Sequence, residues 1–553
     1  MAAPTLSAGS TPAPAASDRR WLFGPWVDLL LGCGLGYALW ISLVPWLGLD
    51  APSLAAAGLV VSVLLAGPHY GATLLRVYGS RSDFRKYRFF TVGWSALVWI
   101  AFVVGLHDLW VGSFLITLYF TWSPWHYTGQ NYGVAVMFLR RRGVPLPPLV
   151  KRALYASFAL SFLLAFASMH RAVQLSSYGV GDFMGSRYSF LPLGLPPGWH
   201  PTIFAVLLGL YAATTAFAAV LLLRRAPARD LVPVAALVVT QALWFSLPHT
   251  WAFATGTRID AQSVAFLFVW AILGHSVQYL WVTTAYAVGK GPGAAAGRVK
   301  YLLATLAAGS AIWTLPALVF APQALGTHPY GMGLFLMIAA AVNLQHFALD
   351  GAIWKLRDTG VGRILIADAK AGEGEPADPA WPRPLRGAAW AFGGAMAAVA
   401  LFGAWTQASV ANAIRGGDQA GFERGRARLV ALGRDDPHYG LFEAVDRIAK
   451  DDRDGAVAAL LASIRLYPTA DAWLLLAQVL DEKGDVERAL AAYRETVTLD
   501  ASRVDAWHRA GVRLLERGQR AAALDALRRA SALSPADARI AADLALAESS
   551  ATP

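Results

Sequence analysis

The sequence predicts an all-α protein, in which a polytopic bundle of about eleven membrane-spanning helices is followed by a soluble solenoid of helical repeats. Of the 553 residues, 56% are hydrophobic and only 15% are charged, whereas about a quarter of the residues are charged in a typical soluble chain. The apolar residues form long runs, and the C-terminal part repeats with a period of 34 residues. These observations predict a disordered tail over residues 1–20, a transmembrane bundle over 21–406 and a soluble domain over 407–553.

Eleven apolar runs are candidate membrane helices, because each is near or above the roughly 20 residues that a helix needs to cross the hydrocarbon. They cover residues 25–47, 53–76, 89–106, 110–139, 153–170, 201–223, 231–254, 261–287, 300–321, 330–354 and 387–406. Basic residues gather in every second connection, within residues 76–88, 140–152, 224–229, 290–300 and 355–370. Since basic loops stay in the cytoplasm, the N-terminus is expected there and the soluble tail on the opposite side. In a Gram-negative cell this describes a multi-pass inner-membrane protein with a periplasmic tail.

The basic residues in these connections explain the positive net charge of the chain. The formal net charge is +11, but the charges sit in short clusters between apolar runs, so they indicate membrane orientation and not a nucleic-acid groove. The single cysteine, Cys33, lies inside the first apolar run and excludes both a disulfide framework and a thiolate metal site. The expected partners are the lipid bilayer, a lipophilic small molecule and a protein, and no nucleic acid is expected.

The sequence of the C-terminal tail repeats with a period of its own. Three residue pairs are 34 positions apart: Trp473 and Trp507, Gly484 and Gly518, and Ala489 and Ala523. An early Trp, small residues at the helix contacts and a helix–turn–helix length of 34 are typical of tetratricopeptide repeats. The tail therefore resembles a short tetratricopeptide array of about three repeats. This resemblance implies a concave surface that binds a peptide or a partner protein.

Five of the eleven histidines fall within predicted spans, on five different runs: His69, His126, His249, His275 and His346. Ionisable residues in the hydrocarbon are costly and indicate function by default. Counting about 1.5 Å per residue from the basic end of each span places His69 and His346 about 10–14 Å deep and His126 and His275 about 21–23 Å deep. His249 is nearest the opposite face, at about 28 Å. The first four are therefore expected to converge on one polar cavity in the core. Imidazoles on several helices are a common way for a bundle to bind a metal. We expect His69, His126, His275 and His346 to be ligands of iron or another transition metal.

Further polar residues accompany these histidines. Asp350 lies four residues after His346 on the same helical face, and it is expected to act as a general base, a ligand or the carboxylate that orients the imidazole. His249 is expected as a fifth ligand or a proton shuttle. Gln130 and Gln278 closely follow two of the other histidines and are expected to support the cofactor. The alternative is that each histidine only hydrogen-bonds a neighbouring helix.

The preferred interpretation is a histidine-lined, metal-dependent intramembrane enzyme that acts on a lipophilic substrate by oxidation. Single histidines spread over many helices resemble the bacterial membrane dioxygenases of the Brp/Blh type, which cleave β-carotene with iron held by histidines. This resemblance implies iron as the cofactor and does not assign individual ligand roles. The paired histidine boxes of membrane desaturases are absent from the chain.

Two other classes of function stay open. One is a non-enzymatic assembly or transport factor that docks a partner through its repeats. The other is a membrane glycosyltransferase with a tetratricopeptide tail, an overall plan that the chain resembles. The first external loop of those enzymes usually carries an acidic pair, and here that loop offers only Asp50.

Overall fold

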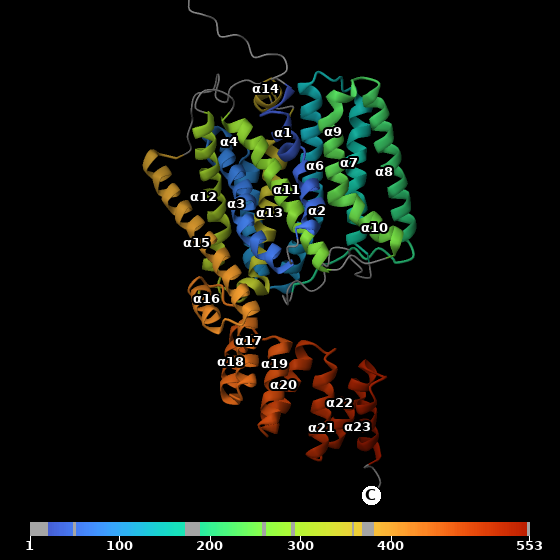
Figure 1. Ribbon diagram of the computed structural model, residues 1–553, viewed down its shortest axis with the longest axis vertical. Helices are drawn as coiled ribbons and strands as arrows, with labels where there is room; N and C mark the ends of the chain where they lie inside the picture. The colour runs from blue at the N-terminus through green and yellow to red at the C-terminus, as the bar shows by residue number, and fades with distance from the viewer. Residues whose placement is uncertain are drawn as a thin grey trace, which may run out of the picture. The chain divides into compact units, whose positions relative to one another are not determined.

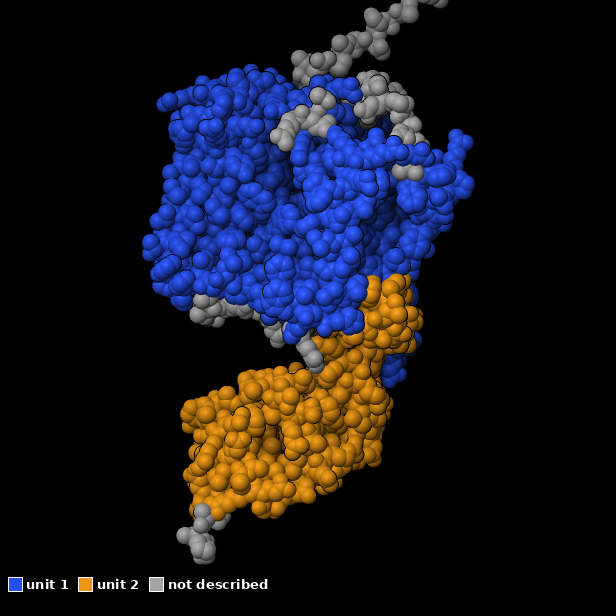
Figure 2. Space-filling view, turned by 180° about the vertical axis from the view of Figure 1, so that it is seen from behind, with its two compact units in different colours: residues 1–317, 335–425 blue, residues 318–334, 426–553 orange. Residues whose placement is uncertain are grey.

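Helices account for the architecture of the chain (Figure 1). The computed structural model describes residues 20–47, 51–171, 188–256, 261–288, 294–356, 359–367 and 381–549, and these residues contain helices and no strand. This confirms the predicted all-α class. The chain divides into two compact units, residues 1–317 with 335–425 and residues 318–334 with 426–553 (Figure 2). The disordered tail predicted for residues 1–20 lies outside the described residues, apart from Arg20.

The first unit is a bundle of apolar helices, some of which contain short π-helical or 3₁₀ segments (η). They are α1 (Pro25–Val27), η2 (Asp28–Gly32), α2 (Leu35–Leu43), η3 (Val44–Trp46), α3 (Ala51–Tyr78), α4 (Arg81–Lys86), η4 (Phe89–Trp94), α5 (Ser95–Gly105), α6 (Leu109–Arg141), α7 (Pro148–Met169), α8 (His200–Leu223), α9 (Ala228–Gln241), η5 (Ala242–Ser246), α10 (Leu247–Thr255), α11 (Ala261–Val288), α12 (Ala294–Val319), α13 (Phe335–Ile353), α14 (Thr359–Ala367) and α15 (Arg383–Gly416). The segment η6 (Tyr330–Leu334), directly before α13, belongs to the second unit.

Among the described residues, seven helices are long and apolar enough to cross a membrane, or eight if the bent pair Pro25–Gly32 and Leu35–Leu43 counts as one span. Every one of the eleven predicted runs is helical, but not every run reaches this apolarity. Phe89–Gly105 is a shorter apolar helix. Helix α6 is 33 residues long and carries polar side chains near its middle. Helix α11 is 28 residues long, but the side chains of its first residues, 261–268, lie outside the described part of the chain. The coarser prediction of several apolar spans is therefore confirmed.

The first predicted span, residues 25–47, is not one straight helix. Its two halves, Pro25–Gly32 and Leu35–Leu43, are bent by 69°. The break falls at Gly34, whose φ of +79° is a left-handed conformation that residues with a Cβ rarely adopt. A Cβ at Gly34 would also lie only 2.6 Å from the side chain of Thr240 on α9.

The backbones of helices α3 and α12 are in direct contact. Gly67 and Gly71 are four residues apart on α3, as Thr305 and Gly309 are on α12. A Cβ built on Gly71 would lie 1.9 Å from the carbonyl oxygen of Thr305, and one on Gly309 would lie 1.9 Å from that of Gly67. Small residues four apart are what allow membrane helices to approach so closely. This contact fixes the turn of α3 that carries His69.

We expect Gly71→Ala to destabilise the folded chain by about 1–3 kcal/mol, the usual cost of overpacking. Gly67→Ala is the matched control, because it lies one turn earlier and a Cβ there meets no atom within 4 Å. The control should be neutral or slightly stabilising, since alanine favours helix more than glycine does. Thermal unfolding of both variants in one detergent measures the difference, and equal midpoints would contradict the close contact.

The tail is built from helix pairs of constant length. Helices α17, α19 and α21 have 13 residues each, and their partners α18, α20 and α22 have 14. Between the two helices of each pair stands a residue with positive φ, namely Asp451, Gly484 or Gly518. The glycine spacing in the sequence therefore marks a left-handed turn. The helices are α16 (Gln419–Ala431), α17 (Pro437–Ala449), α18 (Arg453–Leu466), α19 (Ala470–Glu482), α20 (Val486–Leu499), α21 (Val504–Glu516), α22 (Arg520–Leu533) and α23 (Ala538–Ser549).

The connection between α12 and α13, residues 318–334, belongs to the same unit as the repeats. The guanidinium of Arg434 lies 4.6 Å from the ring centroid of Tyr330, and the rings of His328 and Tyr467 are 5.8 Å apart. The sequence did not predict this packing. The predicted domain boundary at residue 407 lies within α15, and the units divide after residue 425.

Candidate metal centre

Four imidazoles from four helices meet in the interior of the bundle. His69 lies on α3, His126 on α6, His275 on α11 and His346 on α13. Their ring centroids form a closed arrangement, separated by 4.5 Å (His69–His346), 5.0 Å (His346–His126), 5.0 Å (His126–His275) and 5.3 Å (His275–His69). The structure thus brings together the four histidines that were predicted as ligands. We call these four residues the histidine cluster.

One helical turn further along, three polar side chains form a hydrogen-bonded layer. Thr73, Tyr279 and Asp350 each follow a cluster histidine by four residues, which puts them on the same helical faces. The hydroxyls of Thr73 and Tyr279 both donate to Asp350 Oδ1, at 2.8 and 2.7 Å. Trp354 Nε1 donates to the Tyr279 oxygen at 2.8 Å. The helices that assemble the cluster therefore also build this layer, and Asp350 Oδ2 is left to face the imidazoles.

Hydrogen bonds fix the proton on one imidazole and link the other to the polar layer. His69 Nδ1 lies 2.7 Å from the carbonyl oxygen of Ala66, which can only accept, so this nitrogen carries the proton. In a neutral imidazole the second nitrogen is then an acceptor, so His69 Nε2 presents a lone pair. Thr73 Oγ1 lies 2.8 Å from Asp350 Oδ1, 2.6 Å from the Tyr279 oxygen and 3.0 Å from His346 Nδ1. When Thr73 donates to Asp350, His346 Nδ1 donates to Thr73, and His346 Nε2 presents a lone pair as well.

These lone pairs lie at the spacing of two ligands on one ion. His69 Nε2 and His346 Nε2 are 3.1 Å apart, and His346 Nε2 and Asp350 Oδ2 are 3.4 Å apart. Two donors bound at metal–ligand lengths of about 2.0–2.1 Å, at right to tetrahedral angles, are about 2.9–3.4 Å apart. In the described part of the chain, two groups have ligand atoms that all lie within 4.8 Å of one another: His69, His275 and His346, and His126, His346 and Asp350.

Other nitrogens of the cluster are buried without a hydrogen bond. Within the described residues, His126 Nε2 and both ring nitrogens of His275 have no partner. Buried polar atoms are nearly always hydrogen-bonded, so each exception calls for an explanation. His126 Nε2 lies 3.9 Å from Asp350 Oδ2. A cation inside the cluster would satisfy His126 Nε2 and one ring nitrogen of His275, and it would bind the facing Nε2 atoms of His69 and His346.

Aromatic rings pack directly against the imidazoles. Tyr127 stacks on His275 with centroids 3.9 Å apart and planes at 17°. Phe347 stacks on His126 at 4.5 Å and 26°. These rings hold the imidazoles in one orientation and keep water away, and electrostatic interactions are stronger where water is excluded.

The two predicted glutamines take different positions. Gln130 Nε2 donates to Gln278 Oε1 at 2.5 Å and to the carbonyl oxygen of His275 at 3.3 Å. Gln278 Nε2 donates to the carbonyl oxygen of Gly32 at 2.8 Å and to Asn131 Oδ1 at 3.0 Å. Gln130 therefore supports the backbone beside a cluster histidine, whereas Gln278 belongs to an amide network with neighbouring helices.

His249, predicted as a fifth ligand or a proton shuttle, lies on α10 and is buried. It is in neither of the two potential ligand groups found among the described residues. Its sequence position had already indicated a depth nearer the opposite face. A direct role at the histidine cluster therefore has no geometric support.

A cavity of about 330 Å³ opens beside the cluster. That volume is within the usual range of small-molecule sites, roughly 300–1,000 Å³. Its wall is mostly apolar and aromatic, with four polar side chains at the cluster. It is lined by Trp122, Trp125, His126, Gly129, Gln130, Gly133, Val134, Met137, Tyr279, Val282, Phe347, Asp350, Gly351, Trp354, Leu356, Val361 and Leu365.

Sequence reasoning missed Thr73 altogether and did not assign roles to Tyr279 or Trp354. A signal was present, since Thr73 and Tyr279 stand four residues after cluster histidines, as Asp350 does. Among Thr73, Tyr279 and Asp350, only Asp350 was assigned a role from the sequence, because a carboxylate is a familiar partner of imidazole. A threonine in an apolar helix carries no such expectation.

The repeats are the part of the chain that comparison with known proteins identifies. None of the curated proteins compared with the chain matches it, and the resemblance to Brp/Blh-type dioxygenases gains no support. A family model, the tetratricopeptide repeat, matches residues 470–503, which cover α19, α20 and the turn after them. The tail of this chain therefore contains a tetratricopeptide repeat, as the 34-residue spacing predicted.

Proposed function

We propose that this chain is a metal-dependent enzyme of the membrane interior that acts on a lipophilic substrate by oxidation. The histidine cluster and Asp350 Oδ2 would hold iron or another transition metal. One observation carries the proposal: the Nε2 atoms of His69 and His346 face each other at 3.1 Å, with His126, His275 and Asp350 around them. A donor set of imidazoles with one carboxylate suits iron, copper, zinc or nickel. A bound iron would supply one-electron and O₂ chemistry.

The surrounding residues have the arrangement that such chemistry needs. Asp350 keeps Oδ2 toward the cluster because Thr73 and Tyr279 both bond its Oδ1. Partners of this kind orient metal ligands and tune their basicity. The adjoining cavity has an apolar wall, and Tyr279, Gln130 and Asp350 lie along it. A lipophilic molecule in that cavity would have its reacting atoms beside the ligands and away from water.

Elemental analysis of the full chain, purified in detergent and washed with a weak chelator, tests this function. We expect a stoichiometric transition metal, because the cluster has unpaired nitrogens in its interior. A folded chain that holds no transition metal, even after incubation with ferrous iron, would overturn the proposal. In that case one imidazole must carry an Nε2 proton that bridges His69 and His346, and the histidines only join helices.

The tail supports a second role, the binding of a partner. Its tetratricopeptide match, at residues 470–503, is consistent with a peptide- or protein-binding surface. An assembly or transport factor would use this surface alone. The glycosyltransferase alternative depended on Asp50, which lies outside the described residues, and stays a prediction.

The packing within the second unit supports a topology for the chain. The connection 318–334 and the repeats form one unit, so both must lie on the same side of the membrane. That connection has no lysine or arginine, and basic-poor connections are expected on the non-cytoplasmic side. We therefore infer that α15 crosses the membrane and that the repeats face the periplasm in a Gram-negative cell.

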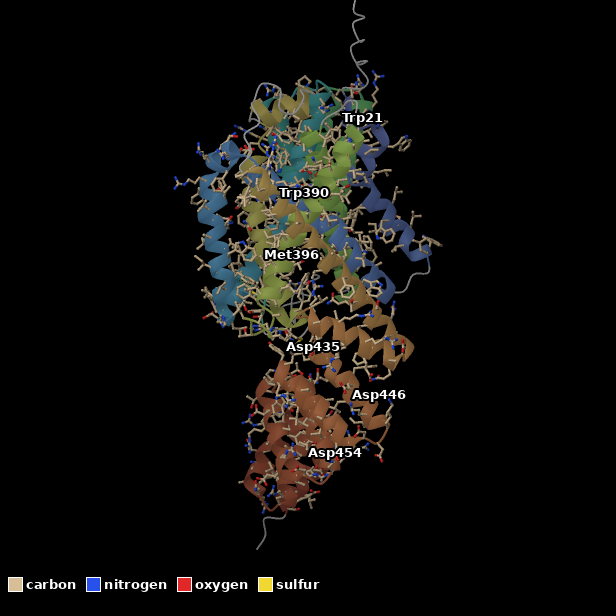
Figure 3. All side chains as sticks on the ribbon, turned by 90° about the vertical axis from the view of Figure 1, so that its left-hand side faces the viewer. Trp21, Trp390, Met396, Asp435, Asp446 and Asp454 are labelled. Atoms are coloured by element: carbon tan, nitrogen blue, oxygen red, sulfur yellow. The ribbon has the colours of Figure 1, made fainter. Side chains whose placement is uncertain are left out.

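Cysteine labelling tests this topology, because the only native cysteine, Cys33, is buried. In a Cys33→Ala background, we expect an impermeant maleimide to label Leu325→Cys and Asp454→Cys from outside spheroplasts. Leu325 is 71% exposed, and the side chain of Asp454, labelled in Figure 3, is 92% exposed. Ser82→Cys, in the basic connection at α4, should be labelled only after lysis. Labelling of Leu325→Cys and Asp454→Cys from opposite sides would contradict the inferred packing.

A further inference from the structure

The lining of the cavity beside the cluster extends along helix α6. On α6 its lining residues run from Trp122 to Met137, and a rise of 1.5 Å per residue makes this wall about 22 Å long. His126 and Asp350 line one part of the cavity, and Val361 and Leu365 of α14 line the other end. A globular ligand does not match a wall of this length, whereas an extended chain does.

Three glycines leave open space in the wall of the cavity. Gly129 and Gly133 lie four apart on one face of α6, and Gly351 follows Asp350 on α13; all three line the cavity. A Cβ built on any of them meets no atom within 4 Å, so close helix packing does not require a glycine here. The space at these positions belongs to the cavity.

Two polar side chains of the site lie near one end of the cavity. His126, with 9% of its side chain exposed, and Asp350 both line it. The rest of the wall consists mainly of tryptophan, phenylalanine and aliphatic side chains. This combination fits an apolar chain whose reacting segment lies beside His126 and Asp350.

We propose that this cavity is the binding site for a single acyl chain, of a free fatty acid or of a membrane lipid. The head group lies at the α14 end, and the chain extends along Gly129 and Gly133 to the histidine cluster. Helix α14 also carries Arg363, whose side chain is exposed, and basic residues at the membrane surface attract anionic head groups. The proposal rests on the metal-dependent function for its chemistry, but the binding site itself can be tested alone.

Photolabelling with two probes tests the site: a fatty acid and a phosphatidylcholine, each with a diazirine at the end of its acyl chain. We expect saturable labelling of peptides from α6 and α13 in the purified full chain. Gly133→Leu should lower this labelling by about tenfold or more, a binding loss of the size that one added side chain causes. A Cβ at Gly133 meets no atom within 4 Å and the remaining side-chain atoms would enter the cavity, so the variant should fold and should keep the metal content of the wild type. Labelling by one probe alone would identify whether the source is a free acid or a lipid.

Gly209→Leu is the matched control, because Gly209 lies on α8, does not line the cavity and also has no atom within 4 Å of an added Cβ. Its labelling should equal that of the wild type. Labelling that is confined to α8 and other outer helices, or that Gly133→Leu leaves unchanged, would overturn the acyl-chain site. Saturable, Gly133-sensitive labelling of a chain without metal would support this site and would overturn the metal-dependent function instead.

Discussion

His346→Ala is expected to lower metal affinity by about 100-fold or more and to be the most damaging single change in the cluster. His346 belongs to both groups of potential ligands, and its Nε2 lies 3.1 Å from His69 Nε2 and 3.4 Å from Asp350 Oδ2. Loss of its imidazole would leave one coordination position open. Even changes to residues that only support ligands typically cost 10–100-fold. Metal content by mass spectrometry and titration against a chelator measure the effect.

The tail provides the matched control for this experiment. His438 and Asp436 form a histidine–carboxylate pair at 2.7 Å, as His346 and Asp350 do in the bundle. The hydrogen bond that His438 Nδ1 donates to Asp436 raises the pKa of His438, so its imidazole is more often charged and is a poorer ligand. His438→Ala should leave the metal content unchanged. Loss of metal from this variant, with metal retained by folded His346→Ala, would locate the ion on the surface.

Much of the helix bundle could be predicted from local sequence. An apolar run of about 20 residues has one low-energy structure in a bilayer, because every backbone group must be paired within the helix. The break at Gly34 was not predictable in this way. It depends on the close approach of Thr240, which is more than 200 positions away in the sequence.

The meeting of the four histidines was predictable in part for a related reason. Helix rise is constant, so residues could be counted from the basic ends, but this put His69 and His346 about 10 Å nearer those ends than His126 and His275. In the structure the four rings are only 4.5–5.3 Å from their neighbours. The side-chain partners were harder to predict. Gln278 was expected to support the cofactor, yet its amide donates to Gly32 and Asn131, because the rotation of each helix is set by its neighbours. The depth of a residue in the membrane can be estimated by counting along the sequence, but the rotation of its helix about the helix axis cannot.

Asp350→Asn and Thr73→Val are expected to weaken metal binding by about 10–100-fold each, for different reasons. Asp350→Asn replaces a charged donor oxygen, so the ligand set itself changes. Thr73→Val keeps the shape of the side chain but removes the hydroxyl that donates to Asp350 and accepts from His346. In cobalt-substituted protein, we therefore expect Asp350→Asn to shift the d–d absorption bands. Thr73→Val should leave these bands in place while it weakens binding.

Thr406→Val separates this effect from a general loss of stability. Thr406 is also fully buried, but its hydroxyl donates only to the carbonyl oxygen of Phe402 one turn earlier on α15, at 2.7 Å. The variant should bind metal as the wild type does. If Thr73→Val and Thr406→Val had the same metal affinity, Thr73 would not orient His346, and the proton arrangement inferred for the two facing imidazoles would be wrong. A normal affinity in Asp350→Asn would exclude Oδ2 as a ligand, and the ion would then be held by imidazoles alone.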